Sequence, residues 1–143
     1  MTENEISKQV VDAAYKIHYR FGPGLLETPY EMMMDRELKK RGLEIQRQIP
    51  IPLIYEGELI DESFRADMIV NRKLILEFKA TEKMHSVYKR QLNTYLKVTN
   101  LKLGLVINFG MDKIKDGIIR MINGQLEDEP KSQAEEELDE PLD

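Results

Sequence analysis

Two opposite charges stand inside a short apolar run that has the composition of a buried β-strand. The run is LILEFKAT, residues 74–81, and the charges are Glu77 and Lys79. Ionised groups are costly to bury unless they are paired or bind something. Successive side chains of a strand point to opposite faces of the sheet, so Glu77 and Lys79 share one face.

The strand that precedes this run supplies a second carboxylate. Residues 66–70, ADMIV, alternate apolar side chains with Asp67 and Ile69. The register that joins apolar to apolar side chains across a three-residue turn pairs Val70 with Leu74, Met68 with Leu76 and Ala66 with Phe78. Asp67 then stands directly opposite Glu77, and like charges in that position destabilise a sheet.

A divalent cation explains why two carboxylates would face each other. Mg²⁺ and Mn²⁺ bind carboxylate oxygens, keep several waters and accept a phosphate oxygen as a further ligand. Lys79 can orient a metal-bound water, help deprotonate it and offset the charge on a phosphate. A structural alternative stays open, in which Glu77 and Lys79 are neighbours on a solvated sheet face and Arg65 pairs with Glu77.

Two helices are predicted before the strands. Apolar residues recur at helical intervals over residues 3–20. A second helical pattern ends at Gly42, a plausible C-terminal cap. It begins either near Leu25 or after the capping residue Thr28, and in the second case Glu27 lies just outside the helix.

A strand-rich stretch follows, over residues 45–80. Glu56-Gly57 and Asn71-Arg72 mark turns within it. Pro50 and Pro52 indicate that the first strand is an edge strand or carries a bulge, because proline cannot donate to a sheet ladder.

The last third of the chain alternates helix and strand. Residues 85–100 have a helical pattern, with Val87, Gln91, Tyr95 and Val98 on or near one stripe, and residues 101–110 form a short apolar strand. The run GIIRMING adds a final strand or a turn. The predicted fold is an α+β or α/β domain, with the order helix, helix, three strands joined by hairpins, helix, strand, and a mixed sheet packed by helices.

The charge of the chain is divided unevenly between a body and a tail. The formal net charge is −5, but residues 127–143 hold nine acidic residues and one base, which leaves 20 bases against 17 acids in residues 1–126. The tail has no aromatic residue and too little apolar surface to fold alone. We expect a domain over residues 1–124 and a disordered acidic tail over residues 125–143. The mildly basic body permits a nucleic-acid partner.

Cysteine content and hydropathy limit the kinds of site that the chain can hold and the compartment in which we expect it. The chain has no cysteine, which excludes disulfides, thiolate metal sites and a cysteine nucleophile and fits a reducing compartment. No apolar run approaches the roughly 20 residues of a membrane span, and the start MTENEISKQV lacks the features of a signal peptide. We expect a cytoplasmic protein with no membrane partner, and a homodimer is left open.

Two motifs taken together resemble one known family. Asp67, nine intervening residues and the run 77–79, EFK, are similar to the D…(D/E)-x-K signature of the PD-(D/E)xK nuclease superfamily, which has the restriction-endonuclease-like fold. Residues 24–30, GLLETPY, resemble the G-x-x-E-x-x-Y pattern of the GxxExxY proteins, small prokaryotic members of that superfamily. The resemblance extends from residue 5 to about residue 123.

The resemblance implies a metal-dependent site. Asp67 and Glu77 would ligate Mg²⁺ or Mn²⁺, and Lys79 would serve the hydrolytic water. Glu27 would be the additional acid, and thus a further metal ligand, that many members of the superfamily direct into the site.

Two further residues match a motif, and two positions depart from the pattern. Gln91 and Tyr95 resemble the Q-x-x-x-Y element of related exonuclease-like members, which implies a role in placing the substrate or the lysine. Ala66 stands where the name of the superfamily has proline, a common departure. Pro29 affects where the second helix begins, and so whether Glu27 reaches the site.

The leading hypothesis is a Mg²⁺-dependent nuclease that cleaves phosphodiester bonds in DNA. The alternative is a catalytically silent module with the same fold that binds nucleic acid or another protein and leaves its carboxylates unused. A small-molecule hydrolase has no support, because Ser86 beside His85 is adjacent in sequence and adjacency is not the geometry of a catalytic triad.

Overall fold

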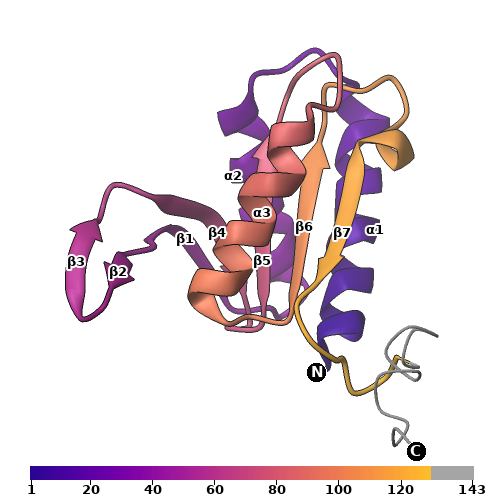
Figure 1. The fold of residues 1–143 in the computed structure, drawn as a ribbon. Coiled ribbons are helices and arrows are strands. Elements are labelled where there is room, and N and C mark those ends of the chain that lie inside the picture. The colour runs from indigo at the N-terminus through magenta and orange to yellow at the C-terminus, as the bar shows by residue number, and fades with distance from the viewer. Residues whose placement is uncertain (130–143) are drawn as a thin grey trace, which may run out of the picture.

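The computed structural model describes residues 1–129 and is built around a five-stranded sheet with the strand order β1-β4-β5-β6-β7 (Figure 1). The parallel pair is β5–β6, and the other neighbours are antiparallel. The sheet is therefore mixed, as the sequence predicts. Its strands are β1 (Ile45–Pro50), β4 (Arg65–Val70), β5 (Leu74–Lys79), β6 (Leu103–Asn108) and β7 (Ile118–Ile122).

Helices cover both faces of the sheet. Helices α1 (Glu3–Phe21) and α2 (Glu27–Lys40) pack on one face, and α3 (Ser86–Thr99) packs on the other (Figure 1). A short 3₁₀ helix, η1 (Ile114–Gly117), precedes β7. Within residues 1–129, no helix combines the length and the apolar composition that crossing a membrane requires.

The two N-terminal helices differ in how they begin. Thr2 and Glu5 form a capping box at the start of α1. Helix α2 begins at Glu27, with Leu26 as its N-cap, so the start after Thr28 is wrong. Pro29 is tolerated because the first turn of a helix has no partners for its backbone N–H groups.

The predicted stripe of α3 is partly wrong. Val87 and Val98, two of its four members, are exposed. The side of the helix that faces the sheet instead carries Tyr88, Leu92, Tyr95 and Leu96. Positions spaced three and four apart form the buried face of a helix, and these four residues have that spacing.

The strand-rich stretch contains five strands where the sequence predicts three. Strands β2 (Leu53–Tyr55) and β3 (Glu58–Asp61) form a separate two-stranded sheet that projects from the body (Figure 1). Their turn is at Glu56-Gly57, as predicted, and both residues have positive φ. We call residues 52–64 the arm. The arm connects β1 to β4, which are neighbours in the main sheet. Strand β1 is at the edge of that sheet, as its prolines predict.

The register of the β4–β5 hairpin is confirmed over its first half. Val70 pairs with Leu74, Ile69 with Ile75 and Met68 with Leu76, across a turn that contains Asn71 and Arg72 in the left-handed region. The ladder ends there, and the two further pairs that we expected, Asp67 with Glu77 and Ala66 with Phe78, are not part of it.

The alternation of β4 also breaks at Asp67. Met68 and Val70 pack with α1 and α2, but Ala66 packs with the α3 side, so the prediction that all three share one face is wrong at Ala66. Opposite Asp67, in β1, Gln48 has φ 49° and is missing from the β1–β4 ladder. The break in alternation therefore lies beside a left-handed residue of the neighbouring strand.

The expected tail starts inside the described residues. Leu126, beyond the expected domain boundary at residue 124, is buried in the core that includes α1. Residues 130–143 of the expected tail lie outside the described residues.

The loop between α1 and α2 is fastened by a buried tyrosine. The hydroxyl of Tyr30 donates a hydrogen bond to the carbonyl of Gly22 and accepts one from the N–H of Leu25 at 3.1 Å. The ring is fully buried and stacks on Phe109, with 4.4 Å between the ring centroids. Tyr30 therefore fixes the loop that leads into Glu27 through its hydroxyl, while its ring packs in the core.

We expect Tyr30→Phe to lower the free energy of unfolding by about 1–3 kcal/mol, because two buried backbone groups lose their partner. Denaturant unfolding followed by circular dichroism measures the change. Tyr19→Phe is the matched control, since Tyr19 is 95% exposed. Equal stability of the Tyr30→Phe variant and the wild type would show that the loop does not depend on this hydroxyl.

Candidate active site

The two predicted acids meet where β4 and β5 stop pairing. The N–H of Phe78 donates to Asp67 Oδ2 at 2.8 Å, and the N–H of Asp67 faces Glu77 Oε1 at 3.4 Å. Side-chain carboxylates thus replace backbone carbonyls as the acceptors at this end of the hairpin. The convergence of Asp67 and Glu77 that the register predicts is present, although the ladder itself does not extend to them.

Glu77 is the most strongly perturbed acid of the site. It is 4% exposed. Burial, the charge of Asp67 and a hydrogen bond with the Asp67 side chain raise the pKa of Glu77 to about 9, and Lys79 opposes the rise. The solvated-face alternative is therefore wrong for Glu77. Arg65, its expected partner in that alternative, contacts the carbonyl of Gln48 instead, at 3.5 Å.

Lys79 lies at the mouth of the site. It is partly buried, and its Nζ lies over the ring of Tyr88, 5.0 Å from the centroid. Its charge acts on both Glu77 and Glu27. The ammonium group thus acts on the carboxylate pair and on the first residue of α2, and the cation–π contact limits where its side chain can go.

Glu27 lies at the rim of the site. As the first residue of α2 it is exposed, yet its pKa is raised by desolvation first and then by the charge of Asp67, with Lys79 opposing. The exposed surface and the desolvation agree if one side of the carboxyl group faces the site and the other faces solvent. Glu27 therefore belongs to the same charged cluster as the pair, at its open side.

Gln91 and Tyr95 approach the pair from α3. Gln91 Nε2 donates to the Tyr95 hydroxyl at 3.0 Å. Burial raises the pKa of Tyr95, and the charges of Glu77 and Asp67 raise it further. The phenol of Tyr95 is therefore close to the carboxylates, and Gln91 orients it.

Sequence analysis missed a polar network behind Asp67. Glu31 is buried and forms an ion pair with Arg47 at 2.7 Å. Gln48 Nε2 donates to Glu31 Oε1 at 2.9 Å and lies 3.4 Å from Asp67 Oδ1. The left-handed backbone of Gln48 is what turns its side chain toward both acids. The spacing of Glu31, one helical turn after Glu27, can be read from the sequence. Its burial and its partners on β1 cannot be predicted from that spacing.

A second missed residue organises the loop that follows Lys79. Asn108, fully buried at the end of β6, accepts from the N–H of Thr81 at 2.9 Å and donates to the Thr81 hydroxyl at 3.1 Å. The Cβ of any larger residue at position 110 would lie 2.4 Å from the Thr81 backbone, so Gly110 permits this close approach. The loop is thereby held against β6 next to the site.

The donor set fits a hydrated divalent ion held by two carboxylates. Among residues 1–129, no group of three or more His, Cys, Asp or Glu side chains is arranged to hold a metal. Mg²⁺ does not require such a cage, because it is commonly bound through one or two carboxylates together with waters and substrate phosphates. Asp67 and Glu77 supply two carboxylates on one side of the opened hairpin, and Glu27 stands nearby.

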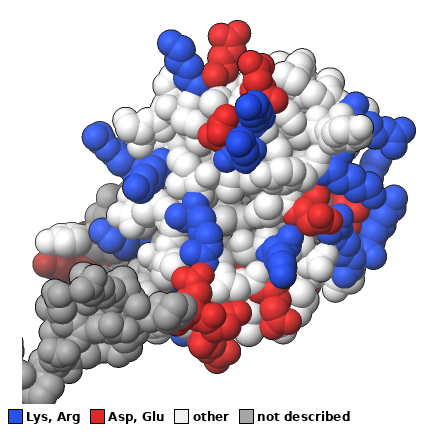
Figure 2. Space-filling view, turned by 90° about the vertical axis from the view of Figure 1, so that its right-hand side faces the viewer, with Lys and Arg blue, Asp and Glu red and all other residues white. Residues whose placement is uncertain are grey.

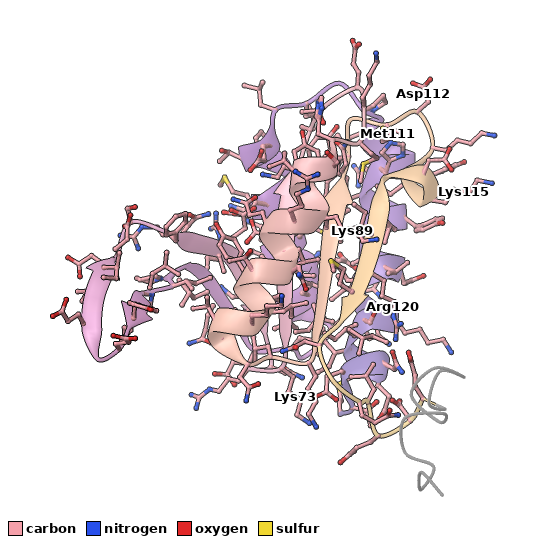
Figure 3. The ribbon with its side chains drawn as sticks, in the orientation of Figure 1. Lys73, Lys89, Met111, Asp112, Lys115 and Arg120 are labelled. Atoms are coloured by element: carbon pink, nitrogen blue, oxygen red, sulfur yellow. The ribbon has the colours of Figure 1, made fainter. Side chains whose placement is uncertain are left out.

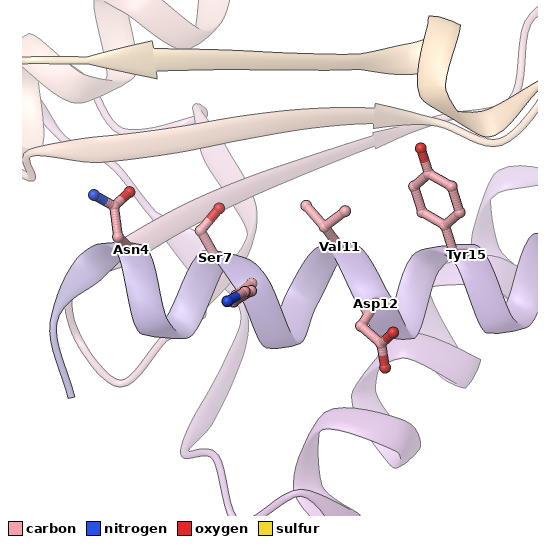
Figure 4. A pocket seen from close by; sticks show the side chains of 6 residues that line it. Asn4, Ser7, Val11, Asp12 and Tyr15 are labelled. Carbon is pink, nitrogen blue, oxygen red and sulfur yellow. The ribbon is translucent and has the colours of Figure 1, made fainter. Parts of the chain in front are cut away.

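Other polar surfaces lie apart from this pair. A hollow of about 480 Å³ runs along α1 on the side toward β7 and is lined by Asn4, Ser7, Lys8, Val11, Asp12 and Tyr15 (Figure 4). At its end Arg120 of β7, labelled in Figure 3, contacts Asn4 and Glu129. None of these residues belongs to the charged cluster, so this hollow is not part of the candidate site.

Comparison with known proteins gives one match. The family model described as the PD-(D/E)XK nuclease superfamily matches residues 4–121, a span that contains every residue of the charged cluster. A superfamily of this kind has the restriction-endonuclease-like fold, and the mixed sheet and three helices are consistent with it, which confirms the predicted fold class. No curated protein and no solved structure matches.

We expect the titration of Glu77 to appear in the pH dependence of stability. With its pKa raised in the folded chain from 4.5 to about 9, the folded state holds a proton that the unfolded state releases. The free energy of unfolding therefore falls as the pH rises between those values, by up to about 1.4 kcal/mol per pH unit. Glu77→Gln removes this loss, so its advantage over the wild type grows with pH.

Urea unfolding at a series of pH values, in the presence of a chelator, measures the difference. Glu127→Gln is the control, since Glu127 is exposed and its variant should follow the wild type at every pH. A constant difference between Glu77→Gln and the wild type from pH 5 to about pH 9 would contradict the burial of a protonated Glu77.

Proposed function

The chain belongs to the PD-(D/E)XK nuclease superfamily, and on that premise we propose that it is a Mg²⁺- or Mn²⁺-dependent nuclease that hydrolyses phosphodiester bonds in DNA. Superfamily membership suggests a nuclease-type function and a nucleic-acid substrate. The observation that carries the proposal is the meeting of Asp67 and Glu77 beside Lys79 at the point where the β4–β5 ladder opens.

Each residue of the cluster has a role in the proposed reaction. Asp67 and Glu77 would hold the ion through their carboxylates, with Glu27 as a further acid from the open side. The bound ion supplies an acidified water and stabilises charge on the phosphate. Lys79 orients the attacking water and balances the negative charge that develops on the phosphate oxygens.

The helix α3 and the network on β1 would serve this arrangement indirectly. Tyr95 lies near the carboxylates and accepts a hydrogen bond from Gln91, and both residues would contact the substrate. Gln48 holds Asp67 from behind through a hydrogen bond that also ties it to Glu31. The open side of the site, between Glu27 and Lys79, is where a phosphodiester would enter.

We expect Asp67→Asn, Glu77→Gln and Lys79→Ala each to lower metal-dependent cleavage of DNA by at least about 100-fold, because each removes a group that acts on the reacting water or its ion. A gel assay with linear and circular DNA, in Mg²⁺ and in Mn²⁺, measures the loss. Lys102→Ala is the matched control for charge, since Lys102 is exposed and precedes β6, and it should keep full activity.

Circular dichroism and a thermal melt of each variant establish that the fold is kept. Cleavage by the Lys79→Ala variant at the wild-type rate would remove the lysine from the proposed chemistry. Absence of metal-dependent cleavage of any nucleic acid by the wild type would contradict the proposed function.

A silent binding module is the second candidate function, and metal binding separates the two. For the nuclease we expect calorimetric titration with Mn²⁺ to show one or two sites whose affinity falls at least about tenfold in Asp67→Asn. Glu62→Gln, in the exposed segment before β4, is the control. Nucleic-acid binding without Mn²⁺ binding would favour the module.

A further inference from the structure

The arm exposes more apolar surface than an isolated hairpin can keep stable. Ile54, Tyr55, Leu59 and Ile60 are each more than half exposed. Side chains project from both sides of the hairpin into solvent (Figure 3). A two-stranded hairpin on its own is marginal in water, and a contiguous exposed apolar patch marks an interaction surface. The arm therefore offers an apolar surface for an interaction.

The charges of the arm decide which class of partner fits it. Residues 52–64 contain four acidic residues, Glu56, Glu58, Asp61 and Glu62, and no lysine or arginine. Phosphates would be repelled, which excludes nucleic acid as the partner of this element. Two arms laid against each other would bring eight acids together, so an arm-to-arm contact is disfavoured as well. The partner surface should be basic and apolar.

Such a surface exists on the same chain, between α1 and α2. A groove of about 290 Å³ has Ile17, Phe21 and Met33 among its lining residues. Phe21, the last residue of α1, is 47% exposed. The floor of the groove is therefore apolar and open.

The rim of this groove carries an excess of positive charge. Four basic side chains line it, Lys16 and Arg20 from α1 and Arg36 and Lys40 from α2, against the single acid Glu37. Glu37 is already paired with Lys16 at 3.0 Å and with Arg41 at 3.2 Å. Within residues 1–129, Arg20, Arg36 and Lys40 form no ion pair. Basic side chains also gather along the right-hand edge of the view in Figure 2.

The arm extends away from the body that carries the groove (Figure 1). It projects from the β1 edge of the sheet, whereas α1, one wall of the groove, lies toward β7 at the other edge. We propose that the chain self-associates, with the acidic, apolar arm of one copy seated in the basic, apolar groove between α1 and α2 of a second copy. Reciprocal exchange of two arms would close the assembly as a symmetric dimer. The inference does not depend on the proposed nuclease activity.

Charge swaps test the proposal on the full chain, by sedimentation velocity over a concentration series. We expect the wild type to associate. Arg36→Glu/Lys40→Glu in the groove and Glu58→Lys/Glu62→Lys in the arm should each weaken association at least about tenfold. Mixing the two variants should restore association, because the reversed arm then meets the reversed groove. Lys102→Glu/Lys115→Glu carries the same charge change as the groove variant outside the interface and should associate like the wild type.

A second variant tests whether the arm, and not another segment, occupies the groove. Ile54→Ser/Ile60→Ser removes apolar surface without changing charge, and it should also weaken association at least about tenfold while circular dichroism and the thermal melt stay those of the wild type. A monomeric wild type at all concentrations overturns the proposal. Failure of the mixed variants to associate overturns it as well. So does an association that the groove variant weakens and the arm variants do not, because the groove would then bind another segment, such as the acidic tail.

Discussion

The end of the β4–β5 ladder is the constraint on which the candidate site depends. Val70, Ile69 and Met68 pair through their backbones, and then the carboxylate of Asp67 takes the N–H of Phe78 in place of a backbone carbonyl. The hairpin opens by this exchange without leaving that donor unpaired. The opening is what allows two acids to approach closely at one end of the hairpin.

Several elements hold the opened end in place from different sides. Gln48, with its left-handed backbone, ties Asp67 to the buried Glu31. Tyr30 fastens the loop that leads into Glu27, and Asn108 fastens the loop that follows Lys79. Strain in the backbone is thus located beside the acids, where the structure around it is well packed. This arrangement is typical of a site whose geometry matters more than local stability.

The sequence predicted the parts of this arrangement that follow from short-range patterns. The alternation of strand β5, the turn at Asn71-Arg72 and the edge position of β1 depend on neighbouring residues alone, and all three are confirmed. The roles of Gln48 and Asn108 depend on contacts between elements far apart in the chain, which no local pattern encodes. Ala66 was placed on the wrong face because the break in alternation at Asp67, beside a left-handed residue of another strand, is not visible in the local pattern of β4.

Mn²⁺ diffused into crystals of the wild-type protein tests the central claim most directly. The account predicts an anomalous density peak about 2.0–2.2 Å from carboxylate oxygens of both Asp67 and Glu77, with Lys79 on the same side of the sheet. It also predicts loss of that peak in Asp67→Asn. A peak elsewhere on the protein, with the Asp67 and Glu77 carboxyl groups still in contact with each other, would contradict the account.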